Sequence, residues 1–157
     1  MKLTMMFCLL MAAPTFAADV VPNARLATVR KAWIEPIDDL KDDKPVSACA
    51  ARLIAERTPL TLAETREDAD IILYVRANIP GTAARMFLGP TGGSPSSYMI
   101  VQHADGTTLW EDGAKYRRAT MRASVIGADD QGKSIECGLA EGLLDRLRDA
   151  MRKARGK

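Results

Sequence analysis

His103 is the single histidine of the chain, and Asp105 follows it two positions later. An imidazole beside a carboxylate is a common composition for a general base, but a base also needs a nucleophile and a group that orients it. The sequence does not place such a set, so we interpret His103 as a polar turn residue and predict no catalytic residue. The alternative is a small-molecule binder or small hydrolase with a pocket near His103.

Two further patterns match ligand sites only in part. The four aspartates within residues 38–43 lack the glycine and the distal glutamate of a calcium loop, so they indicate a solvated acidic loop. Residues 89–94 are rich in glycine, but neither a Gly-Lys-Ser/Thr run nor a helix follows them to hold phosphate. We therefore expect no metal site and no cofactor.

Met86, Phe87 and Leu88 are consecutive large apolar residues within a loop, residues 80–95, that is rich in glycine and proline. Such a run either folds back onto the core or contacts a partner. We expect this loop and the adjoining sheet edge to bind another envelope or secreted protein. A secreted inhibitor that presents the loop to a target enzyme is a further alternative.

The composition is that of one globular domain. The chain has 157 residues, of which 47% are hydrophobic and 27% charged, and its net charge is +2. So small a charge makes a nucleic-acid partner unexpected. The protein fits a non-catalytic interaction or assembly module better than an enzyme.

The first residues are typical of a secretory signal. Lys2 precedes an apolar run over residues 5–13, and small residues favour cleavage near Ala17 or Ala18. The run is shorter than the roughly 20 residues of a membrane span; a buried N-terminal helix is the alternative. We predict a signal peptide (1–17), a flexible tail (18–25) and a single α/β domain (26–157), exported to the periplasm or outside the cell, with no transmembrane segment in the mature chain.

Cys8 lies inside the apolar run of the signal and not at a lipoprotein cleavage motif, so it is expected to leave with the signal. Cys49 and Cys137 then remain. Two cysteines in an oxidising compartment are usually paired, and we predict a disulfide between them. Two buried free thiols are the alternative.

Hydrophobic periodicity predicts five strands and two helices. The strands are expected over residues 28–37, 60–65, 71–79, 97–103 and 107–111, and the helices over 45–57 and 134–155. Residues 71–79 are the most apolar and are expected at the centre of the sheet. Asp105 and Gly106 favour a hairpin turn. The predicted fold is a two-layer α/β sandwich, a mixed sheet of about five strands with both helices packed on one face.

Two short motifs carry a family resemblance. The segment Glu-Asp-Ala-Asp-Ile-Ile-Leu at 67–73 and the segment Asp-Gly-Thr-Thr-Leu-Trp at 105–110 precede an amphipathic last helix. In this respect the chain resembles small exported bacterial envelope proteins with a TolB amino-terminal-domain-like α/β fold. The resemblance covers about residues 26–155 and implies a non-catalytic adaptor or assembly module.

Overall fold

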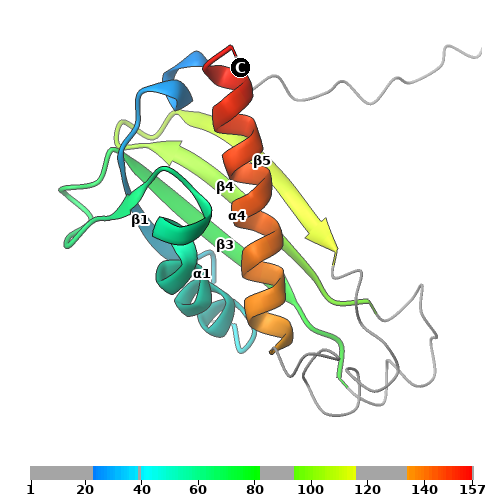
Figure 1. Ribbon diagram of the computed structural model, residues 1–157. Helices are drawn as coiled ribbons and strands as arrows, with labels where there is room; N and C mark the ends of the chain where they lie inside the picture. Colours follow the sequence, from blue (N-terminus) through cyan, green and yellow to red (C-terminus); the bar gives the residue numbers. More distant parts are fainter. Residues whose placement is uncertain (1–22, 39, 82–93, 116–133, 157) are drawn as a thin grey trace, which may run out of the picture.

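The computed structural model describes residues 23–38, 40–81, 94–115 and 134–156 (Figure 1). These residues form a short 3-10 helix, five strands and two longer helices. In chain order the elements are η1 (Ala24–Ala27), β1 (Lys31–Pro36), α1 (Asp43–Arg57), β2 (Thr61–Leu62), β3 (Ile71–Asn78), β4 (Ser96–His103), β5 (Thr108–Lys115) and α4 (Ile135–Ala154).

The strands form one mixed sheet in the order β2-β1-β3-β4-β5. β1 runs parallel to β2 and to β3, whereas β3 with β4 and β4 with β5 are antiparallel. β3 is the middle strand, as its apolar sequence predicts. The β4–β5 hairpin turns at Asp105 and Gly106, and Gly106 has a φ of 85°, which a residue with a Cβ rarely adopts.

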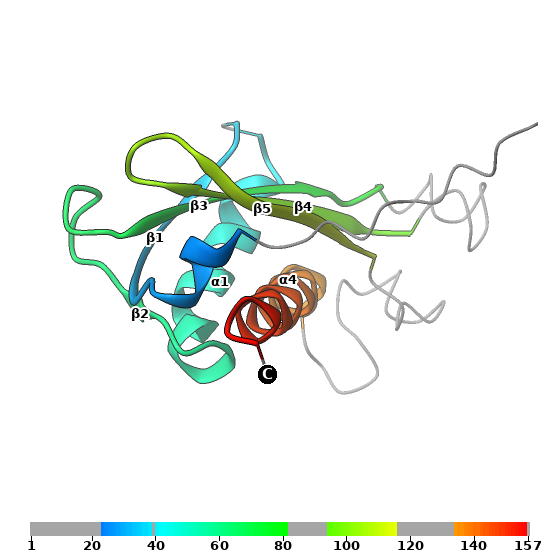
Figure 2. The ribbon, with the colours of Figure 1, turned by 90° about the horizontal axis from the view of Figure 1, so that it is seen from above.

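Both long helices lie on the same side of the sheet (Figure 2). Leu143, Leu144 and Leu147 of α4 are fully buried against it, and each contributes about 1.5–3 kcal/mol of burial free energy. Gly142 marks a close approach of α4 to β5, because a Cβ at this position would lie 3.3 Å from that of Ala114. The predicted two-layer sandwich with both helices on one face is confirmed.

Several element ends differ from the sequence prediction: β1, for example, covers Lys31–Pro36 and not residues 28–37. The second strand has two residues, Thr61–Leu62, instead of six. β5 continues to Lys115, four residues beyond its expected end. Asn23 and Arg25, which the sequence assigned to a flexible tail, belong to the start of the fold: the Asn23 side chain accepts the N–H of Arg25 at 3.0 Å and caps η1.

Candidate functional site

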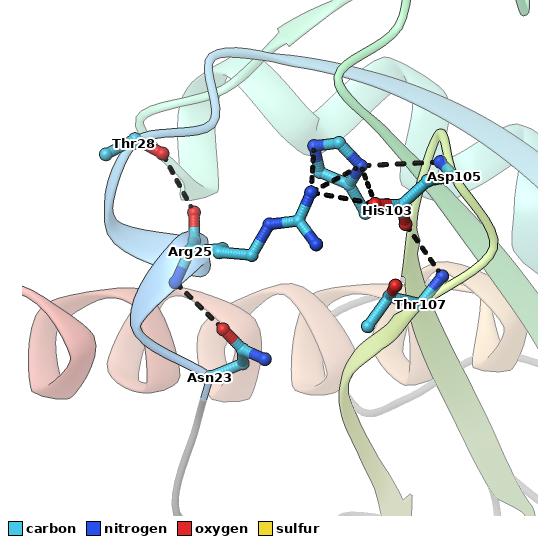
Figure 3. A network of polar contacts seen from close by, with 6 residues as sticks. All are labelled: Asn23, Arg25, Thr28, His103, Asp105 and Thr107. Carbon is cyan, nitrogen blue, oxygen red and sulfur yellow. Dashed lines mark hydrogen bonds and ion pairs between the residues drawn. The ribbon is translucent and has the colours of Figure 1, made fainter.

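His103 ends β4, and its ring meets two charged side chains beside the hairpin turn (Figure 3). Arg25 of η1 places Nη2 at 3.1 Å from Nδ1 and 3.2 Å from Nε2 of His103. The same nitrogen donates to Oδ2 of Asp105 at 2.8 Å. That carboxylate also accepts the backbone N–H of Thr107 at 2.9 Å. The cluster thus joins the N-terminal segment to the β4–β5 turn.

Two carboxylates near this turn are held ionised by backbone donors. The N–H and then the side chain of Thr107, followed by the Arg25 guanidinium, hold the pKa of Asp105 far below its ordinary range. The backbone N–H groups of Lys31 and Arg30 donate to Oδ2 of Asp70 at 2.8 and 2.7 Å and lower its pKa below 3.8. Both groups therefore act as fixed acceptors at neutral pH.

The geometry around His103 favours a structural latch. In the part of the chain that the structure describes, its recorded side-chain contacts are with Arg25 and Asp105 and not with a hydroxyl or thiol nucleophile. A ring whose two nitrogens face a guanidinium is badly oriented for taking a proton from a substrate. A small-molecule binder or small hydrolase with a pocket near His103 stays the untested alternative.

The acidic segment 38–43 is not simply a solvated loop. Asp43 is 0% exposed, and its Oδ1 accepts the N–H of Ala77 at 2.8 Å. Asp42 accepts the N–H of Ile79 at 3.0 Å. The interpretation as a solvated loop is therefore wrong for Asp43, because its carboxylate satisfies a buried donor near the end of β3.

The predicted contact residues Met86, Phe87 and Leu88 lie outside the described residues, as do the predicted signal peptide and Cys8. Nothing in the structure tests those predictions. Within the described ranges, no helix combines the length and the apolar character that crossing a membrane requires.

The sheet face opposite the helices carries a patch of large side chains, which we call the open face: Trp33, Ile72, Tyr74, Tyr98 and Ile100. Along their strands these residues alternate with residues of the core and are themselves outside the core cluster. The strand register places Trp33 opposite Ile72 and Tyr74 opposite Ile100. Ile72, in the middle, is 8% exposed, while the other four are half-buried.

A chain of polar contacts holds one side of the open face in place. The indole N–H of Trp33 donates to Oε1 of Glu35 at 3.0 Å. This oxygen lies 3.4 Å from Nε of Arg66. Arg66 in turn donates from Nη2 to the Tyr74 hydroxyl at 2.8 Å. Two aromatic rings of the open face are therefore tied to each other through one ion pair.

Further along β3, a second ion pair borders the open face. Arg76 lies beside Asp38, with Nη2 3.2 Å from Oδ2. Burial, and then a hydrogen bond with Glu111, raise the pKa of Tyr98 above 10.0. Tyr98 also covers the glycine of β5, since a Cβ on Gly113 would lie 3.5 Å from its ring. The open face thus has an apolar centre and a rim of paired charges.

The predicted disulfide between Cys49 and Cys137 is confirmed. It joins α1 to α4, with the two Cα atoms 5.1 Å apart and the cysteines separated by 88 positions in the sequence. A loop of this length corresponds to about 4–5 kcal/mol in the chain-entropy model. Arg52 lies against both sulfurs, with Nη2 3.3 Å from Sγ of Cys49 and 3.1 Å from Sγ of Cys137.

The sequence did not predict the contact of Arg25 with His103, the contact of Arg52 with the disulfide, or the open face. Arg25 and Arg52 are 78 and 85 positions away from His103 and Cys137 respectively, so no local spacing connects them. The open face left a trace in the sequence, because Tyr74 and Arg76 alternate with core residues of β3.

No protein-family model matches the chain, and no curated protein sequence matches it significantly. Solved structures that resemble the chain include the following three. An uncharacterised lipoprotein B from Nitrosomonas europaea has 11% identity and a TM-score of 0.48, over 82% of this chain and 88% of that chain. A PelC variant, a dodecamer from Paraburkholderia phytofirmans, has 11% identity and a TM-score of 0.46, over 78% and 90%.

A putative lipoprotein from Caulobacter crescentus has 15% identity and a TM-score of 0.40, over 79% of this chain and 92% of that chain. Likenesses this distant say nothing of what this chain binds or does. They do not support the TolB-like name either.

Proposed function

We propose that this chain is an exported, non-catalytic envelope protein that binds another exported protein through its open face. The observation that carries the proposal is the open face itself. Both long helices cover the other side of the sheet (Figure 2), and Trp33, Tyr74, Tyr98 and Ile100 keep part of their surface exposed.

The composition of the open face favours a protein as the partner. Tyrosine, tryptophan and arginine are the residues most enriched where binding energy concentrates in protein interfaces, around an apolar centre with a polar rim. The rim charges are paired within the chain, as in Glu35 with Arg66 and Asp38 with Arg76. Such a surface attracts anionic lipid or nucleic acid weakly, because those partners are held mainly by unpaired cations.

The predicted loop contact is consistent with the same surface. Residues 82–93 connect β3 to β4, and these two strands carry Ile72, Tyr74, Tyr98 and Ile100. The apolar run 86–88 is therefore tethered to the strands of the open face. We include this run in the proposed binding surface.

The proposal is tested by crosslinking the tagged protein in cells and identifying the products by mass spectrometry. Ile100→Lys places a charge within the open face and is expected to remove the specific product. Arg148→Glu, on an exposed position of α4, is the matched control and is expected to keep it. If a folded Ile100→Lys protein retains every product of the unaltered chain, the open face is not the binding surface.

A further inference from the structure

The guanidinium of Arg52 lies against a disulfide rather than a carboxylate. Its Nη2 is within 3.3 Å of Sγ of Cys49 and within 3.1 Å of Sγ of Cys137. A neutral sulfur is a weak hydrogen-bond acceptor, so this contact adds little to the oxidised protein. A thiolate at either position would be stabilised strongly by the same cation.

Cys137 has a second feature that favours a thiolate. It lies in the first turn of α4, where Ser134 caps the helix and accepts the backbone N–H of Cys137 at 3.3 Å. The positive end of the helix dipole stabilises a negative charge at this position. The arginine and the helix end therefore act on the same sulfur from two independent elements.

The two cysteine residues differ in exposure. Cys49 is 7% exposed, whereas Cys137 is half-buried. A thiol reagent therefore reaches Sγ of Cys137 more easily, and Cys49 becomes the leaving group. Arg52 contacts Sγ of Cys49 as well, so the group that leaves is also stabilised. A leaving thiolate that is stabilised in this way speeds exchange.

We infer that the Cys49–Cys137 disulfide is a thiol–disulfide exchange site for an external dithiol, with Cys137 as the sulfur attacked. The reagent thiolate forms a bond to Sγ of Cys137, and the bond to Cys49 breaks with its electron pair on Cys49. The second thiol of the reagent then displaces Cys137 and closes the reagent's own disulfide. Two electrons and two protons pass from the dithiol to the cysteine pair.

Other contacts across the seam between the two helices do not involve the disulfide. Arg57 of α1 pairs with Glu141 of α4, with Nη2 2.7 Å from Oε1. Ile54 of α1 and Leu144 of α4 are buried in the same core cluster. The reduced chain is therefore expected to stay folded, with the two thiols held next to Arg52.

The test is a redox titration of the purified exported chain with reduced and oxidised dithiothreitol. Arg52→Met is expected to shift the equilibrium about tenfold toward the disulfide, which is about 30 mV for two electrons. Arg148→Met is the matched control, because it removes an exposed cation of α4 that does not touch sulfur, and it is expected to shift the equilibrium less than twofold. Equal equilibrium constants for Arg52→Met and the unaltered chain would overturn the inference.

A second measurement separates exchange from general loosening of the fold. In a Cys49→Ser background, the rate of alkylation of Cys137 by iodoacetamide is followed against pH. Half-maximal alkylation is expected at least one pH unit below the value of about 8.5 for a free cysteine, and Arg52→Met is expected to remove this difference. A midpoint at or above the free-cysteine value, or unfolding on reduction, contradicts the proposal.

Discussion

Replacing Asp43 tests how much the contact between the start of α1 and the end of β3 stabilises the fold. Its carboxylate accepts the N–H of Ala77 at 2.8 Å inside the protein and that of Asp38 at 3.3 Å near the surface. Asp43→Ala leaves the buried donor of Ala77 without an acceptor, at a cost of about 1–3 kcal/mol. It also removes an acidic group from the first turn of α1, worth about 0.3–1 kcal/mol. Together these contributions give an expected loss of about 1–4 kcal/mol.

Asp43→Asn provides the informative comparison. An amide oxygen still accepts the N–H of Ala77, while its NH₂ group cannot accept from Asp38, so we expect roughly half the loss of the alanine variant. Asp149→Ala, on an exposed surface of α4, is the control and is expected to change stability by less than about 1 kcal/mol.

The assay is urea unfolding followed by far-UV circular dichroism at neutral pH with the disulfide intact. The reasoning fails if the free energy of unfolding of Asp43→Ala lies within about 0.5 kcal/mol of that of the unaltered chain. This margin is about the error of the method. It also fails if the asparagine variant loses as much stability as the alanine variant.

Three further predictions concern packing, pH and the disulfide. Gly142→Val is expected to lose about 1–3 kcal/mol because its side chain would push α4 away from β5, whereas thermal unfolding unchanged from that of the unaltered chain would refute the close approach. The pKa of Asp70 is lowered in the fold, so the stability that its carboxylate contributes is fully present above the ordinary pKa of 3.8 and is lost as pH falls through the folded value. Asp70→Asn should therefore lose less stability than the unaltered chain between about pH 5 and pH 2. Parallel losses of stability for the two proteins over this range would argue against the prediction. Replacing both Cys49 and Cys137 by serine is expected to lower the free energy of unfolding in urea by about 4–5 kcal/mol. A loss below about 1 kcal/mol would contradict the claim that the disulfide stabilises the fold by restricting the unfolded chain.

The fold could be predicted from the sequence where a single hydrophobic periodicity dominates a segment. The apolar stripe of α4 and the Asp105–Gly106 turn each follow from residue type and spacing alone. The end of β5 did not, because Asp112 and Gly113 are unfavourable in strands. The structure accommodates Gly113 there by placing the Tyr98 ring over it, which is a tertiary effect.

The candidate surfaces were harder to predict from the sequence than the fold, for a physical reason. Residues 71–75 are almost continuously apolar, which is typical of a strand covered on both faces. In the described part of the chain the helices cover one face, so Tyr74 remains half-exposed on the other. The contact of Arg52 with the disulfide needs the packing of α1 on α4 and has no counterpart in local sequence.

The most direct test of the binding proposal is site-specific photocrosslinking in cells. A photoreactive phenylalanine analogue is placed at Tyr98 on the open face, and in a second protein at Arg148 on the exposed side of α4. The account predicts one discrete crosslinked protein from position 98 that is absent from position 148. The same products from both positions, or none from position 98 in a folded exported protein, would contradict it.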